Sequence, residues 1–318
     1  MVASRKASVS WTEVGEESAG QRIDNFLLGH LKGVPKSHVY RILRSGEVRV
    51  NSGRVDATYR LRWGDRVRIP PVRTAPAAPV SAPKQCKPML AGHVIYEDDS
   101  LLALNKPAGW AVHGGSGVSR GIIEQLRAER PQARFLELVH RLDRETSGIL
   151  LVAKKRSALV ALHALLRGNG VDKRYLALVK GRFPDEKRTV RQSLTRYLTE
   201  AGERRVAVDR EGKAAETQFY RLRRFEEATL MQAHLLTGRT HQIRVHLAHL
   251  GFPIAGDDKY GDFAWNKALT KAGLKRMFLH AASLSFVHPV LGEPLALEAP
   301  LPEELQAYLD SLNPLDPA

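Results

Sequence analysis

Cysteine is nearly absent from this sequence. The 318 residues include only one, Cys86. A lone thiol cannot form an internal disulfide, and it cannot build the cysteine clusters that hold structural zinc. The composition therefore fits a protein of a reducing compartment, and we expect a cytoplasmic location.

Long hydrophobic runs are also missing. The longest apolar stretches have about five residues, as in ILLVA at 149–153, whereas a membrane-spanning helix needs roughly 18. The first residues, MVASRKASVSWTEVGEESAG, lack the apolar centre of a secretion signal. We therefore expect neither export nor a membrane as a partner.

Acidic residues are outnumbered by basic ones. The chain has 34 Asp and Glu against 49 Lys and Arg, which gives a net charge of +15 and an isoelectric point near 10.1. Such an excess is typical of proteins that bind nucleic acids. A basic amphipathic helix of the kind that binds membrane surfaces is not evident. The charge favours an acidic polymer as the partner.

One segment divides the chain. Residues 74–88, TAPAAPVSAPKQCKP, contain four prolines and four alanines and offer little to bury. We interpret them as a linker. The predicted organisation is an N-terminal tail (1–19), a small basic domain (20–73), this linker (74–88) and a large domain (89–318).

The sequence of the small domain predicts two helices followed by short strands. Apolar residues recur at helical spacing in QRIDNFLLGHLKG and again in PKSHVYRILRSG, where Ser37 is a candidate N-cap and Gly46 a helix stop. VRVN and DRVRIP are predicted strands. Residues 20–73 hold twelve Lys or Arg and four Asp or Glu, so they supply +8 of the net charge.

These segments resemble an S4 RNA-binding domain of the αL type, through the patterns QRIDNFL, KSHVYRILRSGEVRVNSGRV and GDRVRIP. The resemblance implies that basic side chains of this domain dock on structured RNA. The candidate RNA-binding residues are Lys36, Arg41, Arg44, Arg49 and Arg54. An ordinary solvated basic surface is the alternative.

The large domain alternates strand and helix patterns without a regular repeat. Predicted strands include GILLVAKK, KRYLALVKGRF, ATLMQAHLLT and FLHAASLSFV. Predicted helices are IIEQLRAER, RSALVALHALLRG and THQIRVHLAHLG. Strands predominate, which favours an α+β fold around a mixed or antiparallel sheet.

Two patterns resemble sites for other kinds of chemistry, but the residues around them do not support such sites. GVSRG at 117–121 matches a hydrolase nucleophile elbow at Ser119, but a strand does not precede the serine. His241, His246 and His249 are spaced by five and three residues, which matches no zinc-binding helix pattern. Capping, packing or RNA contact is the better interpretation of these histidines. The glycines also fit no nucleotide-binding motif, so we expect neither a metal nor a cofactor.

VHRLDRETSG, at 139–148, places Asp143 between two arginines immediately before an apolar run. Alone it would read as a charged turn. Together with KRYLALV, which contains Tyr175, and TGRTHQIRVH, which contains Arg239 and Arg244, it resembles the pseudouridine synthases of the RluA family. NKPAG, AVHGG and FLHAASLSFVHP extend the resemblance over residues 90–300.

The resemblance implies a cofactor-free isomerisation of uridine to pseudouridine. It assigns Asp143 as the catalytic aspartate, acting either as a nucleophile or as a base that removes the ribose 2′ proton. Arg244 matches the family's arginine that pairs with this aspartate, and Tyr175 matches the tyrosine that lies against the uracil. Arg141 matches a position that helps to fill the space left by a flipped nucleotide.

The resemblance is greatest to family members that modify 23S, large-subunit, ribosomal RNA. We therefore expect a monomeric enzyme whose partner is this RNA or a large-subunit assembly intermediate. Two alternatives remain open. One is the same reaction on other ribosomal or transfer RNA uridines, and the other is a non-catalytic RNA-binding factor of ribosome assembly.

Overall fold

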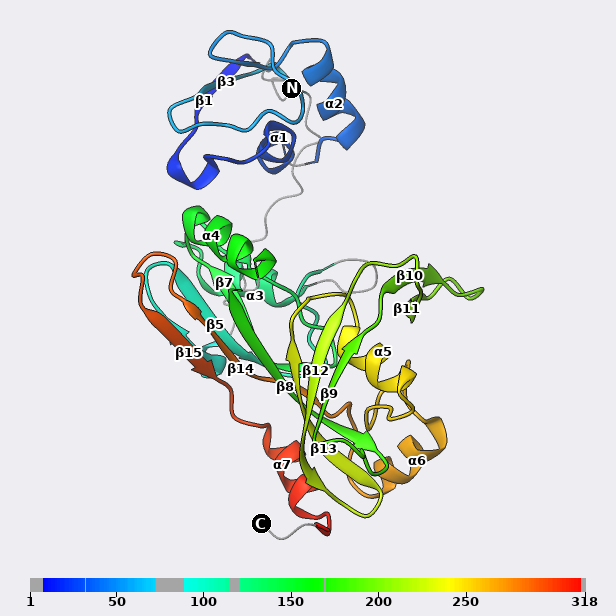
Figure 1. The fold of residues 1–318 in the computed structure, drawn as a ribbon. Helices are drawn as coiled ribbons and strands as arrows, with labels where there is room; N and C mark the ends of the chain where they lie inside the picture. The colour runs from blue at the N-terminus through cyan, green and yellow to red at the C-terminus, as the bar shows by residue number, and fades with distance from the viewer. Residues whose placement is uncertain (1–7, 32, 73–88, 115–119, 169, 316–318) are drawn as a thin grey trace, which may run out of the picture. The chain divides into compact units, whose positions relative to one another are not determined.

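The computed structural model describes the chain except for residues 1–7, 32, 73–88, 115–119, 169 and 316–318 (Figure 1). The chain divides into two compact units, one of residues 1–87 with 155–157 and the other of residues 88–154 with 158–318. The predicted linker at 74–88 and the candidate Ser119 lie outside the described residues. Within the described residues, no helix is long and apolar enough to span a bilayer.

The N-terminal unit combines two helices with a small antiparallel sheet. Its elements are β1 (Ser10–Glu13), η1 (Glu16–Ser18), α1 (Ile23–His30), α2 (Lys36–Arg44), β2 (Arg49–Val50) and β3 (Arg66–Ile69). The strand order is β1-β3-β2. Ile23 and Leu27 of α1, together with Val39 and Ile42 of α2, pack onto Val67 of the sheet in one apolar core.

The structure differs from the expected organisation at two places. Residues 10–18 were expected in a tail, yet β1 pairs with β3 and Val14 is completely buried in the core, so the unit begins before residue 20. Helix α2 starts two residues earlier than its predicted cap allows, because Pro35 and not Ser37 occupies the N-cap. Gly46 does end the helix, with φ at 72°.

The C-terminal unit is built on one mixed sheet. Its strands are β4 (Val94–Glu97), β5 (Leu101–Lys106), β6 (Glu137–Leu138), β7 (Ser147–Ala153), β8 (Val171–Lys180), β9 (Lys187–Arg191), β10 (Leu194–Leu198), β11 (Arg204–Val208), β12 (Glu216–Arg224), β13 (Ala228–Leu235), β14 (Leu279–Val287) and β15 (Pro294–Glu298). Its helices are η2 (Ala91–His93), α3 (Ile122–Glu129), α4 (Arg156–Arg167), α5 (Gln242–His249), α6 (Phe263–Lys271) and α7 (Glu303–Asp310).

In the part of the chain that the structure describes, the main sheet has the order β4-β5-β7-β14-β8-β13-β12-β9, with β15 on β14 and β6 on β7. Neighbouring strands are antiparallel except for β7 and β14, which run parallel. The predicted α+β fold with a mixed sheet is thereby confirmed. Strands β10 and β11 pair only with each other and form a separate hairpin (Figure 1).

Both faces of the sheet are covered, which explains the unbroken apolar run ILLVA. Ile149 and Leu151 of β7 pack with Leu162 of α4, whereas Leu150 and Val152 pack in the cluster that contains α3. The β8–β13 half is arranged in the same way, with α5 in one apolar cluster and α6 and α7 in another. A strand buried on both faces loses the alternation that a half-exposed strand shows.

Candidate active site

A buried lysine fixes the loop that carries Asp143. This loop joins β6 to β7, and it continues from Asp143 into Arg144. Lys106 is fully buried, and its Nζ donates to the carbonyl oxygens of Pro107 (2.8 Å), Trp110 (2.9 Å) and Arg144 (3.0 Å). The lysine of NKPAG therefore ties the end of β5 to the residue that follows Asp143.

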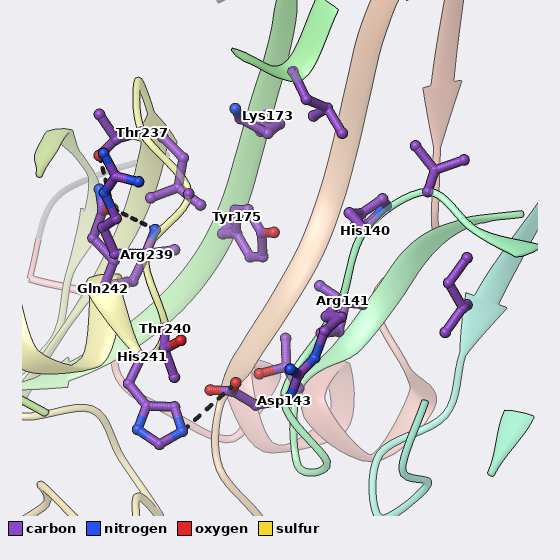
Figure 2. Close-up of a pocket in the computed structure, with 18 of the residues that line it drawn as sticks. His140, Arg141, Asp143, Lys173, Tyr175, Thr237, Arg239, Thr240, His241 and Gln242 are labelled. Atoms are coloured by element: carbon purple, nitrogen blue, oxygen red, sulfur yellow. Dashed lines mark hydrogen bonds and ion pairs between the residues drawn. The ribbon is translucent and has the colours of Figure 1, made fainter. Parts of the chain in front are cut away.

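Asp143 and Tyr175 line a cavity of about 980 Å³. Figure 2 shows Tyr175 projecting from β8 into this space, with Asp143 entering from the β6–β7 loop. The exposed Arg141 and the first residues of α5 complete the wall near the aspartate. Burial raises the pKa of Tyr175, and the Asp143 charge raises it further, so the phenol is neutral at neutral pH.

Arg244 is held by carboxylates on both sides. Its Nε and Nη2 donate to the two oxygens of Asp257, each at 2.7 Å. Its Nη1 donates to Asp143 Oδ2 at 3.1 Å, and Nη2 reaches Asp258 Oδ1 at 3.3 Å. The guanidinium carbon also lies 5.1 Å from the centre of the Tyr260 ring. Because Nε and Nη2 of Arg244 form the bidentate pair with Asp257, Nη1 is the nitrogen that is directed at Asp143.

The opposite charges of Arg244 and its carboxylate partners stabilise one another. Burial opposes ionisation of Asp257, yet its bonds to Arg244 and to the backbone N–H groups of Tyr260 and Lys259 lower its pKa. Burial likewise opposes the charge of Arg244, and its bonds to Asp257 and Asp143 more than compensate, so its pKa is raised. The Arg244 side chain is 4% exposed, so it presents a fixed positive charge to Asp143.

His241 is a neighbour of Asp143 that the sequence interpretation did not place there. Its Nε2 lies 3.7 Å from Asp143 Oδ1, and its Nδ1 lies 2.8 Å from the Tyr260 hydroxyl. A sequence signal existed, because His241 precedes Arg244 by three residues, which is close to one helical turn. Arg196 of β10 also lines the cavity, where it donates to the Thr240 hydroxyl.

The other sequence candidates are distributed as follows. His246 is buried and bonded to Thr217 Oγ1 (2.9 Å) and the Gln192 carbonyl (3.1 Å), which is a packing role. Among the described residues, no group of His, Cys, Asp and Glu is suited to hold a metal ion. The five basic candidates of the N-terminal unit are all exposed, namely Lys36, Arg41, Arg44, Arg49 and Arg54.

Known proteins share this arrangement of segments. Residues 100–249 match the family described as RNA pseudouridylate synthase, and residues 21–67 match the S4 domain. The chain is 55% identical to the ribosomal large subunit pseudouridine synthase C of Escherichia coli K12, over 96% of this chain and 97% of that protein. It is 56% identical to the protein of the same name from Yersinia pestis, over 94% of each chain.

A solved structure agrees with the sequence matches. Human RNA Pseudouridylate Synthase Domain Containing 4 superposes with a TM-score of 0.60 at 26% identity, and the match covers 72% of this chain and 96% of that one. The chain therefore has the fold of an RNA pseudouridine synthase, which is an isomerase. The chain belongs to the RluA family of these enzymes and carries an N-terminal S4 domain.

Proposed function

We propose that this enzyme converts specific uridines of 23S ribosomal RNA to pseudouridine, with Asp143 as the reactive carboxylate. Relatives that match nearly the whole chain are named ribosomal large subunit pseudouridine synthase C, and this shared name supports large-subunit ribosomal RNA as the substrate. The observation that carries the residue assignment is the Asp143 carboxylate, which faces the cavity under the hydrogen bond from Arg244.

The reaction rearranges atoms without consuming any external group. The bond from ribose C1′ to uracil N1 breaks, the base turns, and C1′ bonds to C5. The C5 proton leaves and N1 gains a proton, so the substrate and product are isomers. Asp143 begins this sequence either by adding to the sugar or base as a nucleophile or by removing the C2′ proton. Either route needs an ionised carboxylate, and Arg244 donates a hydrogen bond to the carboxylate of Asp143.

Two cavity residues suit the handling of a flipped nucleotide. A stacked uridine hides its glycosidic carbon, so the nucleotide must leave the helix before it reacts. Arg141, exposed at the cavity wall, is suited to fill the vacated space. Tyr175 is suited to pack its ring against the uracil, and its neutral phenol can relay the C5 proton by accepting it on oxygen while the O–H proton passes to another acceptor.

The N-terminal unit supplies affinity for RNA in this proposal. Its exposed basic residues contact phosphates, so they strengthen binding without entering the chemistry. We propose that the enzyme acts as a monomer in the cytoplasm, without a cofactor, on 23S RNA or on a large-subunit assembly intermediate.

Loss of the C5 proton can be measured to test which kind of RNA the enzyme modifies. Large-subunit, small-subunit and transfer RNA carrying 5-³H-uridine should be incubated separately with the purified enzyme. We expect tritium release into water from large-subunit RNA alone, in amounts that match a few uridines per molecule. Release from transfer RNA at an equal rate would reassign the substrate, and release from none of them would contradict the assignment.

Tyr175→Phe should separate chemistry from binding. The ring remains to pack against the uracil, whereas the hydroxyl is lost. We expect the single-turnover rate at saturating RNA to fall roughly a hundredfold or more, since proton transfer by a positioned group contributes at least about 10². The dissociation constant of the RNA should stay unchanged. A loss of affinity with an unaltered rate would restrict Tyr175 to binding.

A further inference from the structure

His241 combines an uncommon backbone conformation with a helix start that its side chain does not cap. It is the N-cap of α5, its φ and ψ are 54° and 20°, and its side chain makes no capping hydrogen bond. This left-handed region is uncommon for residues other than glycine, although asparagine, aspartate and histidine are enriched in it. Asparagine is also among the strongest N-cap residues. Histidine is not among the preferred N-cap residues and its side chain caps nothing here, so the reason for this residue is to be sought in the contacts of its ring.

The ring connects Tyr260 with Asp143. Nδ1 lies 2.8 Å from the Tyr260 hydroxyl oxygen, and Nε2 lies 3.7 Å from Asp143 Oδ1. Figure 2 shows the imidazole and the carboxylate facing each other at the base of the cavity. The same left-handed backbone carries the ring into this position at the start of α5.

The neighbours of Tyr260 determine which nitrogen of His241 carries the hydrogen. The Val206 N–H donates to the Tyr260 hydroxyl oxygen at 2.9 Å. The hydroxyl hydrogen then needs an acceptor, and among the described residues His241 Nδ1 is the one within reach. A neutral ring that accepts at Nδ1 carries its hydrogen on Nε2, toward Asp143. Burial lowers the pKa of His241, so the ring is neutral at neutral pH.

A second donor completes the support of Asp143. Arg244 contacts only Oδ2 of the carboxylate. The terminal torsion of an aspartate side chain is soft, so one contact leaves the plane of the carboxylate free to turn. A donor directed at Oδ1 removes that freedom. A separation of 3.7 Å is longer than a hydrogen bond, and such contacts often shorten when the substrate binds.

We propose that His241 is a positioning residue for Asp143, with its Nε2–H directed at Oδ1 while Arg244 holds Oδ2, and with Tyr260 fixing the tautomer. The inference rests on the proposed function, in which Asp143 is the reactive carboxylate. It predicts that His241 governs the rate of the chemical step and leaves the affinity for RNA unchanged.

His241→Asn separates this role from a structural one. Asparagine tolerates the left-handed backbone, whereas the Tyr260 hydroxyl loses its acceptor at Nδ1, so the protein should stay folded with at most a modestly lower melting temperature. The single-turnover rate on 5-³H-uridine large-subunit RNA at saturation should nevertheless fall roughly tenfold or more, because a small misplacement of a reacting group has a large effect on rate. His249→Asn is the matched control, since His249 is exposed on the same helix, and it should keep the full rate.

Tyr260→Phe tests the link between the two rings. It removes the hydroxyl but keeps the ring beneath Arg244, so it should slow the reaction in the otherwise unchanged enzyme. In the His241→Asn background it should slow the reaction no further, because the tautomer that it fixed is gone. Tyr260→Phe also removes the acceptor of the Val206 N–H. The resulting loss of stability should appear both in the otherwise unchanged enzyme and in His241→Asn.

The outcomes distinguish this inference from the proposed function. A full rate in His241→Asn, while Asp143→Asn is inactive, would overturn the positioning role alone. An active Asp143→Asn would overturn the proposed function. If His241→Asn slows the reaction only through weaker RNA binding or a smaller folded fraction, His241 is structural. Equal slowing by Tyr260→Phe in both backgrounds would show that Tyr260 acts without His241.

Discussion

Asp143→Asn should reduce pseudouridine formation to below about one-thousandth of the normal rate, since general-base or nucleophilic action supplies up to roughly 10⁴. The amide keeps the size of the carboxylate and removes both its charge and its basicity. Neither route open to Asp143 then remains. The measurement is the single-turnover release of tritium from 5-³H-uridine large-subunit RNA, with pseudouridine quantified in the same digest.

Folding and binding should survive this change. Asp143 is partly exposed, and Arg244 keeps its bidentate partner Asp257, so the variant should melt near the normal temperature. Asp258→Asn is a matched control, because Asp258 also contacts Arg244 but has a side chain that is 69% exposed. It should lose little activity. Substantial turnover by Asp143→Asn would contradict the assignment of the reactive group.

Arg244→Met should be the most destabilising change at the site. It leaves the completely buried Asp257 without its cationic partner, and breaking a buried ion pair in this way costs about 3–5 kcal/mol of unfolding free energy. The rate should also fall roughly tenfold to a hundredfold among folded molecules, because a hydrogen bond to the Asp143 carboxylate is lost. Chemical denaturation and single-turnover kinetics measure the two effects.

The two effects should separate in a double variant. Arg244→Met with Asp257→Asn removes the unpaired buried charge, so much of the stability should return while the rate stays low. In Arg244→Met alone, burial favours the protonated form of Asp257 and raises its pKa above that of the unfolded chain. The folded state then binds more protons, so the variant should become relatively more stable as the pH falls. Recovery of the rate together with the stability would show that Arg244 acts only as a structural partner of Asp257.

Local patterns predicted the strands of the sheet centre. The apolar runs of β7, β8, β13 and β14 are long enough to indicate buried strands, and flanking turn residues marked their ends. Strand β1 was missed because SWTE is short, largely polar and exposed. Its position depends on pairing with β3, more than fifty residues away, and no local pattern reports such a pairing.

The candidate site could be predicted in part. Asp143, Tyr175 and Arg244 stood in segments that resemble a known family, and the structure brings all three to one region. The partner Asp257 escaped notice, since its contact with Arg244 depends on how the segment between α5 and α6 folds back onto α5. His241 was considered from the sequence as a metal, packing or RNA-contact residue. Its proposed positioning role depends on its positive φ and on the hydroxyl of Tyr260, which the sequence does not reveal.

The central claim is that Asp143 of this enzyme isomerises uridines in large-subunit ribosomal RNA. Its most direct test is the map of pseudouridines in total RNA from a strain that lacks the protein, compared with the same strain producing the unchanged protein or Asp143→Asn. We expect certain pseudouridines of the large-subunit RNA to be lost, to return with the unchanged protein, and to stay absent with Asp143→Asn at an equal protein level. A map that is unaltered by the loss of the protein, or that Asp143→Asn restores, would contradict the claim.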